Sequence, residues 1–243
     1  MIKVQNVQNA QEGVSAVKKF LYETCDNNTV LFLSGGITPQ ALYEQLAIEE
    51  KLTIGAAGMV DERFGKKYHE GSNERMIKDS GLLQYLETFP APFFPILQNG
   101  LSREKTAEKY NETVRFLLSE FSKSIAILGI GKDGHTAGLP AGIQNSVLRE
   151  NSGSSKLRIK NDRLVAGFDD FPGPQKERIT MTFEGLSKLD WLFVLAFGEE
   201  KKEALVKTFQ KSPPAGGELE IPARFYTRVE IAPKTLLITD QKV

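Results

Sequence analysis

The sequence is poor in the residues that build disulfide frameworks and metal sites. It has one cysteine, Cys25, and two histidines, His69 and His135, in 243 residues. A single cysteine excludes an internal disulfide and suits a reducing compartment. The two histidines lie far apart and belong to no cluster with metal-ligand spacing. We therefore expect a cytoplasmic protein without a metal ion.

The chain also lacks an excess of charge of either sign. It carries 31 Lys+Arg against 31 Asp+Glu, which gives no reason to expect a nucleic-acid partner. No apolar run approaches the roughly 18 residues of a membrane-spanning helix, and the N-terminus has no basic-then-apolar signal pattern. We expect no membrane partner, and a monomer or weak homo-oligomer. The length of 243 residues fits one α/β domain over residues 1–243.

Short apolar runs alternate with amphipathic segments of helical period along the chain. The predicted strands cover residues 29–33, 56–60, 125–130, 164–168, 178–183, 191–197 and 236–239. The predicted helices cover residues 8–24, 39–50, 73–83, 102–121 and 199–209, with a short one from Pro222. Thr38 and Ser72 are expected as N-caps, and residues 85–100 and 144–161 are predicted to be irregular. This alternation predicts an α/β fold of three layers, with a mostly parallel, Rossmann-like sheet and helices on both faces.

The strand predicted over residues 125–130 leads into the strongest functional signal. A glycine-rich turn follows it and carries Asp133, His135 and Thr136. Ligands of open α/β sheets bind at the carboxyl ends of strands, which is where this turn lies. The turn is therefore a candidate site for chemistry that uses His135.

The same turn formally matches a dinucleotide-binding pattern. Residues 129–134 read G-I-G-K-D-G, but the G-x-G-x-x-G pattern requires a helix that opens at its third glycine. Gly138, Pro140 and Gly142 follow instead, and these residues disfavour a helix. We expect no dinucleotide cofactor here.

A second candidate site is the glycine loop, which we define as Ser34-Gly35-Gly36-Ile37-Thr38. It joins a predicted strand to a helix with Pro39 at its first position. Free N–H groups and the positive end of the helix dipole favour an anion at such a place, and phosphate is the usual occupant. The alternative is a tight turn with a structural role alone. A nucleoside-triphosphate loop is excluded, because no Gly-Lys-Ser/Thr follows.

Charged residues lie at the ends of other predicted elements. Asp61-Glu62-Arg63 follows the strand over residues 56–60, where a functional site and a solvated loop both stay open. Arg178 and Lys201 are candidate clamps for an anion. A lysine in the first turn of a helix opposes the helix dipole unless an anion lies nearby. With the glycine loop and His135, these residues predict a pocket for acid–base chemistry on a phosphorylated small molecule.

These segments resemble the 6-phosphogluconolactonase family, within the wider glucosamine/galactosamine-6-phosphate isomerase superfamily. The similar segments are residues 33–39, Asp61-Glu62-Arg63 with His69 and Ser72-Asn73, residues 129–137, residues 178–180, and Gly198 with Lys201. They follow the order and spacing of the family over most of the chain. Gly-His-Thr-Ala at residues 134–137 is the most specific of them.

The resemblance implies an enzyme that hydrolyses 6-phospho-D-glucono-1,5-lactone to 6-phosphogluconate, in the oxidative pentose phosphate pathway, without a cofactor. His135 would activate water and would be oriented by Asp133 or Asp61. Arg63 or backbone amides of the glycine turns would stabilise the oxyanion. The implied phosphate-binding residues are Ser34, Gly35, Gly36, Thr38, Arg178 and Lys201.

The sequence departs from the family pattern at several places that bear on substrate details. Ile37 stands where Ser or Gly is usual, and residues 138–142 read Gly-Leu-Pro-Ala-Gly instead of Ser-Leu-Phe-Pro-Gly. Gly173 replaces a common lysine, for which Lys176 is a candidate substitute.

Two alternatives to the lactonase stay open. One is a glucosamine-6-phosphate deaminase, in which Asp61 would abstract a proton and His135 would open the sugar ring. That branch usually reads Gly-His-Ile-Ala-Phe-Asn-Glu, which Thr136 and Gly138 do not match. The other is a non-catalytic sugar-phosphate-binding protein, which would need the glycine loop but not His135.

Overall fold

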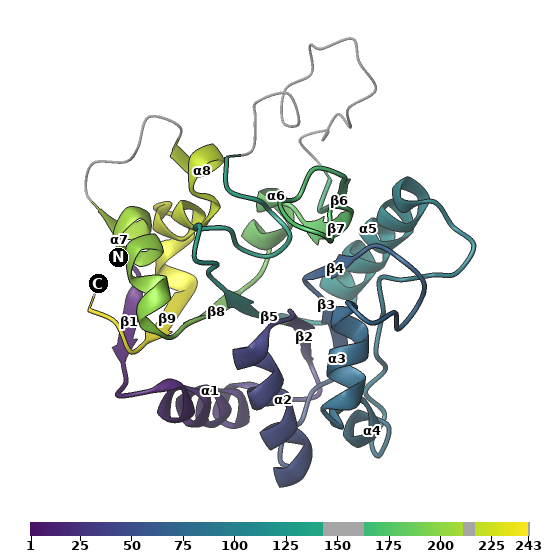
Figure 1. Cartoon of the computed structure of the whole chain (residues 1–243). Helices are drawn as coiled ribbons and strands as arrows, with labels where there is room; N and C mark the ends of the chain where they lie inside the picture. The colour runs from purple at the N-terminus through teal and green to yellow at the C-terminus, as the bar shows by residue number, and fades with distance from the viewer. Residues whose placement is uncertain (143–162, 211–216, 243) are drawn as a thin grey trace.

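The large sheet has six strands in the order β1-β9-β8-β5-β2-β3, and every pairing in it is parallel (Figure 1). The structure, a computed structural model, describes residues 1–142, 163–210 and 217–242. The strands of this sheet are β1 (Lys3–Asn6), β2 (Thr29–Leu33), β3 (Ala56–Met59), β5 (Lys123–Gly129), β8 (Trp191–Ala196) and β9 (Thr235–Thr239). The sheet confirms the predicted α/β fold class.

The interior strands are apolar along their length because other elements cover both of their faces. Every residue of β2 and of β9 is buried, which is typical of parallel strands covered on both sides. The sequence did not predict β1. Its residues are mostly exposed and polar, and its pairing with β9 at the edge of the sheet makes it a strand.

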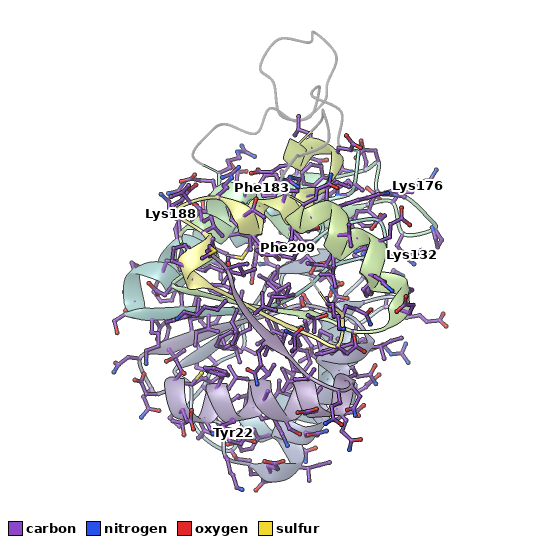
Figure 2. The ribbon with its side chains drawn as sticks, turned by 90° about the vertical axis from the view of Figure 1, so that its left-hand side faces the viewer. Tyr22, Lys132, Lys176, Phe183, Lys188 and Phe209 are labelled. Atoms are coloured by element: carbon purple, nitrogen blue, oxygen red, sulfur yellow. The ribbon has the colours of Figure 1, made fainter. Side chains whose placement is uncertain are left out.

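Helices lie on both faces of the large sheet and make the predicted layers (Figure 1). α1 (Ala10–Thr24) and α2 (Ile37–Glu49) pack against each other on one face. α7 (Lys202–Phe209) packs on η2 (Pro222–Thr227) on the other. Figure 2 shows Tyr22 of α1 and Phe209 of α7 on opposite sides of the strands. The remaining helices are α3 (Asn73–Asp79), α4 (Leu82–Leu86), α5 (Arg103–Glu120), α6 (Phe183–Ser187), α8 (Gly217–Glu220), η1 (Glu199–Lys201) and η3 (Ala232–Lys234).

The predicted start of α2 is wrong. Gly36, not Thr38, is the N-cap, with a φ of 117° that lets the helix begin at Ile37. No side chain caps this end. Pro39 lies in the first turn, where its missing N–H has no intrahelical partner to lose. The first N–H groups of α2 therefore stay available to a ligand.

Two other predicted boundaries also differ. The helix predicted over residues 73–83 is two helices, because Gly81 takes a φ of 82° between α3 and α4. Ser72 caps α3 as predicted, by accepting a hydrogen bond from the N–H of Arg75. The strand predicted over residues 178–183 ends at Met181, because the Thr182 side chain caps α6.

A smaller antiparallel sheet of β4 (Asp61–Arg63), β7 (Arg178–Met181) and β6 (Val165–Phe168) stands beside the large one. The alternative of a solvated loop at Asp61-Glu62-Arg63 is wrong. Asp61 and Glu62 are buried, and all three residues pair with β7. The sequence did not predict this sheet, because the pairing joins residues as distant as Arg63 and Arg178.

The strand order puts a topological switch point between β2 and β5. From β2 the chain continues outward to β3, and from β5 it continues the other way to β8. The loops after β2 and β5 therefore diverge and leave a crevice, where ligands of open α/β sheets bind. The glycine loop follows β2. The glycine-rich turn that carries Asp133 and His135, which we call the His135 turn, follows β5. The segment 144–161, predicted to be irregular, lies outside the described residues.

Candidate active site

A cavity of about 580 Å³ lies at the switch point. Its lining includes every predicted site residue except Asp133, namely Ser34, Gly35, Gly36, Thr38, Asp61, Arg63, His135, Arg178 and Lys201. These residues come from the glycine loop, the small sheet, the His135 turn and the loop after β8. Parallel strands end at one edge of their sheet, so residues far apart in sequence meet there.

A buried tyrosine, Tyr43, fixes the glycine loop at its first residue. The Tyr43 hydroxyl donates to the Ser34 carbonyl at 3.0 Å and accepts from the Ser34 N–H at 3.1 Å. Gly35 leaves no room for a side chain, because a Cβ there would lie 1.9 Å from Oδ1 of Asn73. These contacts hold the loop open toward the cavity, with the N-terminus of α2 behind it.

The His135 turn pairs the imidazole with Asp133. Nδ1 of His135 donates to Oδ1 of Asp133 at 2.6 Å, and this bond lowers the pKa of Asp133 to about 2. The bond leaves Nε2 of a neutral imidazole as the proton acceptor. Of the two carboxylates left open by the sequence, Asp133 is the one that hydrogen-bonds to the ring. Asp133 itself does not line the cavity, so its position is behind the histidine.

Gly131 and Thr136 shape this turn. A Cβ at Gly131 would lie 2.0 Å from Nδ1 of His135, so only glycine allows the His135–Asp133 pair. The Thr136 hydroxyl donates to the Gly129 carbonyl at 2.9 Å and also contacts the hydroxyl of the buried Tyr226. The next residue, Ala137, takes a φ of 52°, an uncommon conformation for a residue with a side chain.

Asp61 is a buried carboxylate between cationic groups. Burial raises the pKa of Asp61, and the charges of Arg63, Arg178 and His135 oppose this shift. The Asn73 side chain donates to the Asp61 carbonyl at 3.0 Å and to its Oδ2 at 3.3 Å. Asp61 is thus held in the cavity wall without a hydrogen bond to His135.

Glu62 points to the opposite side of β4 and organises the residues around it. Its carboxylate accepts from the N–H groups of Arg63, Asn73 and Glu74 at 2.6–2.8 Å, and from the Ser72 hydroxyl at 2.9 Å. Burial raises the pKa of Glu62, and these four donors oppose the shift. Glu62 therefore ties the start of α3 to β4 and fixes Asn73.

Arg63 and Arg178, which we call the arginine pair, bring two cations to the cavity. They are direct partners in the β4–β7 ladder. Arg63 donates through Nη1 to the Gly71 carbonyl at 2.8 Å. Within the described residues Arg178 makes no ion pair, and desolvation together with the charge of Arg63 lowers its pKa to about 10. Like charges directly opposite each other are unfavourable in a ladder, so the pair favours an anion in the cavity.

Lys201 approaches the cavity from η1. It is half-buried, and no ion pair to it is found in the part of the chain that the structure describes. The Asp240 carboxylate accepts from the Gly198 N–H at 3.1 Å and fixes the start of this turn. Glu200 and Asp240 also line the cavity, so its lining is not uniformly basic.

Unpaired polar atoms gather around this cavity. In the described segments, buried side-chain atoms without a hydrogen-bond partner occur on six residues, and Ser34, Arg63, Asn73 and Arg178 line the cavity. Such atoms are costly unless a ligand or water satisfies them. Three are donors or hydroxyls, and one is the Oδ1 acceptor of Asn73. The cavity therefore suits a polar, anionic ligand that carries hydroxyl groups.

Sequence reasoning assigned no role to several cavity residues, among them Asn73, Phe171 and Asp240. Asn73 lies within a segment that resembles the family, and that resemblance was the available signal. Phe171 lies in an exposed turn segment, and Asp240 follows the last strand, so neither had a local signal. Lys176, the candidate substitute for a missing lysine, is exposed and does not line the cavity; Figure 2 shows it at the outer surface.

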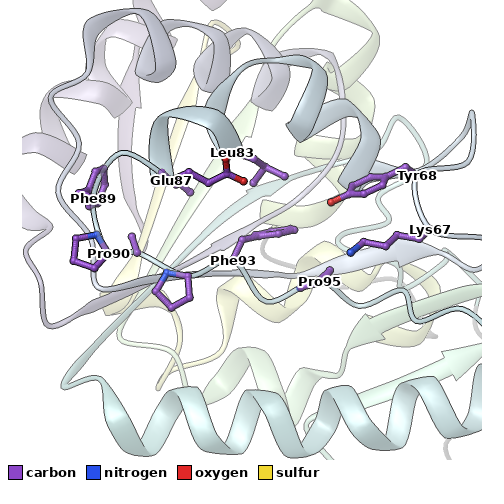
Figure 3. A pocket seen from close by; sticks show the side chains of 11 residues that line it. Lys67, Tyr68, Leu83, Glu87, Phe89, Pro90, Phe93 and Pro95 are labelled. Atoms are coloured by element: carbon purple, nitrogen blue, oxygen red, sulfur yellow. The ribbon is translucent and has the colours of Figure 1, made fainter.

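Another hollow, of about 460 Å³, contains none of the predicted site residues. Aromatic and proline rings such as Phe89, Pro90 and Phe93 line it, with Lys67 and Glu87 at its sides (Figure 3). Among the described residues, no group of three or more His, Cys, Asp or Glu could hold a metal ion. No helix in the same ranges is long and apolar enough to cross a membrane.

Fold and cavity together define an α/β protein with a cavity at the carboxyl edge of a parallel sheet whose lining suits a small anionic molecule. Comparison with known proteins identifies its family. The model of the family described as glucosamine-6-phosphate isomerases/6-phosphogluconolactonase matches residues 6–232. The chain belongs to this family.

Relatives of known name agree. The chain is 30% identical over 183 residues to the 6-phosphogluconolactonase of Thermotoga maritima, with 74% of each chain covered. It is 31% identical to a Helicobacter pylori 6-phosphogluconolactonase, with 74% of this chain and 72% of the relative covered. The solved Thermotoga maritima structure matches with a TM-score of 0.71 at 26% identity, over 98% of both chains. The Plasmodium vivax 6-phosphogluconolactonase, at 20% identity, shares the fold with a TM-score of 0.75 over 100% of this chain and 91% of that one.

Proposed function

We propose that this protein is an enzyme that hydrolyses 6-phospho-D-glucono-1,5-lactone to 6-phosphogluconate. The observation that carries the proposal is the His135–Asp133 pair at the edge of a cavity with two ladder-paired arginines and a helix N-terminus. The named relatives and the family support the same activity. A base beside an anion site is what hydrolysis of a phosphorylated lactone requires.

In the proposed mechanism the phosphate binds to the glycine loop, Arg178 and Lys201. His135, with its Nδ1–H held by Asp133, takes a proton from water through Nε2 as the water attacks the lactone carbonyl. Arg63 or backbone N–H groups of the glycine turns stabilise the tetrahedral oxyanion. The protonated His135 then returns its proton to the leaving ring oxygen, and Asp61 keeps the surrounding cations in place.

The test is hydrolysis of freshly generated 6-phosphogluconolactone, followed by proton release and corrected for spontaneous opening. The wild type should accelerate this reaction, and His135→Ala should lose about 10²–10⁴ in turnover while it stays folded. Unphosphorylated gluconolactone is the control and should react far more slowly, because it cannot use the phosphate site. A loss below about tenfold in His135→Ala would remove His135 as the base.

The outcomes also separate the alternatives. If the wild type does not accelerate lactone hydrolysis but releases ammonia from glucosamine 6-phosphate, the deaminase function is correct. If it binds 6-phosphogluconate without either activity, it is a sugar-phosphate-binding protein. In that case His135→Ala should leave binding nearly unchanged.

A further inference from the structure

Phe171 is the one buried residue in the loop between β6 and β7, residues 169–177, which we call the Phe171 loop. Its ring contacts two side chains that line the cavity, Arg178 and His135. The guanidinium carbon of Arg178 is 4.3 Å from the ring centroid. The imidazole of His135 meets the ring edge-on, with centroids 5.5 Å apart and planes at 81°. One side chain therefore contacts both the proposed base and a proposed phosphate ligand.

The contact with Arg178 has a consequence for binding. A guanidinium over an aromatic face is attracted by the ring quadrupole without the use of its N–H donors. A carboxylate partner would instead occupy those donors and neutralise the charge. Nε of Arg178 is buried and has no hydrogen-bond partner among the residues that the structure describes. The ring can therefore hold the guanidinium in place while its donors stay free for an anionic ligand.

The contact with His135 adds a second restraint on the imidazole, beside the bond to Asp133. The Asp133 bond fixes Nδ1 but leaves the ring free to tilt about it. An edge-to-face aromatic contact has a preferred geometry, so Phe171 limits this tilt. Nε2 then keeps one direction relative to the cavity.

Arg103 fixes the Phe171 loop from outside the cavity. Its guanidinium lies 3.5 Å from the Asp169 carboxylate and 3.4 Å from that of Glu177, at the two ends of the loop. Its aliphatic part packs on Gly167, where a Cβ would lie 3.1 Å from Cγ of Arg103. Within the loop, the N–H of Phe171 donates to the Lys176 carbonyl at 3.1 Å.

We propose that Phe171 is a positioning residue that holds His135 and Arg178 in their working arrangement, and that Arg103 acts on the reaction through Phe171. The kinetic part of this proposal rests on the proposed lactone hydrolysis. Arg103 does not line the cavity, so its substitution can act on catalysis only indirectly, and a double-mutant cycle with Phe171 tests whether it does so through the loop.

The test is a double-mutant cycle on 6-phosphogluconolactone hydrolysis with Phe171→Leu, Arg103→Met and the double variant. Phe171→Leu keeps an apolar side chain but loses the ring, and should lower kcat/KM by about 10- to 30-fold through both a higher KM and a lower kcat. Phe171→Tyr keeps the ring and should stay within about threefold of the wild type. Arg103→Met should lower kcat/KM by about 3- to 10-fold in the wild type and have almost no effect in the Phe171→Leu background. Phe116→Leu and Arg75→Met, at exposed positions on α5 and α3, are the matched controls.

A second measurement does not depend on enzymatic activity. The chain has two histidines, so proton NMR resolves one Hε1 signal for His135 and one for His69. The variant His135→Ala assigns them. Phe171→Leu should shift the His135 signal through the lost ring current and leave His69 in place. An unmoved His135 signal, or Arg103 and Phe171 effects that multiply, would overturn the proposal. A wild type without lactonase activity would refute the proposed function, while the NMR result would still decide the Phe171–His135 contact.

Discussion

Arg63 and Arg178 are directly opposite each other in the β4–β7 ladder, and both line the cavity. Desolvation, together with the charge of Arg63, lowers the pKa of Arg178 to about 10. Two guanidinium groups so placed repel each other in the free protein and are neutralised when an anion binds. We therefore expect the pair to cost stability and to contribute to the binding of an anion.

Replacement of Arg178 should separate these two effects. Arg178→Ala should raise KM for the phosphorylated lactone by the loss of a charge-assisted bond, about 1.5–3 kcal/mol or about 10- to 150-fold. Thermal unfolding should show no comparable loss of stability, because the repulsion with Arg63 is removed at the same time. Steady-state kinetics and a melting curve check both parts, with Arg75→Ala as the surface control. An unchanged KM would remove Arg178 from the phosphate site.

The carboxylate behind His135 should matter for turnover. Asp133→Asn keeps the size of the side chain but removes the charge that orients and supports a protonated imidazole, so kcat should fall by about 10- to 1,000-fold with little change in KM. Asp79→Asn, at the surface of α3, is the control. A loss below about twofold would assign Asp133 a structural role only.

The same carboxylate should stay ionised to unusually low pH. The hydrogen bond from His135 lowers the pKa of Asp133 from 3.8 to about 2. The stability that this bond gives is thus fully present above about pH 4 and is lost as the pH falls through about 2. Carbon NMR of the carboxyl groups over this range measures the titration, and an ordinary Asp133 titration would contradict the bond.

Gly129 at the end of β5 and Gly131 in the turn that follows allow a matched steric test. Gly131→Ala places a Cβ 2.0 Å from Nδ1 of His135 and should break the His135–Asp133 pair, with a loss of kcat similar to that of Asp133→Asn. Gly129→Ala meets its nearest atom, the Leu195 carbonyl oxygen, at 3.7 Å, an ordinary contact. Its kcat should stay close to wild type. Equal effects of the two substitutions would mean that the His135 turn is not as crowded as the structure shows.

Glu74 gives a prediction about stability and pH. It is fully buried, its Oε2 has no hydrogen-bond partner in the described part of the chain, and its Oε1 accepts from the Leu97 N–H at 2.7 Å. Burial, together with the charge of Glu62, raises the pKa of Glu74 from 4.5 to about 7. A carboxyl group with a raised pKa binds its proton more tightly in the folded state, so the free energy of unfolding should fall as the pH rises from about 4.5 to 7.

Glu74→Gln removes this titration. It should stabilise the protein at pH 8 by up to roughly 3 kcal/mol relative to wild type, and have a much smaller effect at pH 5. Urea unfolding at the two pH values measures the difference. The exposed Glu70→Gln serves as the comparison and should change neither value by more than about 0.5 kcal/mol. A stabilisation that is equal at both pH values would show that Glu74 does not titrate in this range.

Elements with a strong local pattern could be predicted from the amino-acid sequence. The apolar run Thr29–Leu33 and the amphipathic period of residues 102–121 fixed β2 and α5, because strand and helix burial repeat with different periods. The sequence also indicated that the glycine loop and His135 would meet, since both follow parallel strands that end at one edge. The single-domain organisation, the cytoplasmic location and the roles of the individual site residues stay predictions.

The contacts between side chains could be read only from the tertiary structure. Arg63 and Arg178 are neighbours in the β4–β7 ladder, and Asp133, not Asp61, is the partner of His135. Phe171 contacts both His135 and Arg178. The charged residues Asp61-Glu62-Arg63 form strand β4, in which Asp61 and Glu62 are buried. The periodicity of a sequence indicates which residues are buried, but not which residues they contact. The contacts named above join segments that no local pattern links. The fold class could be predicted from the sequence, while the chemistry of the cavity depended on pairings that only the folded chain creates.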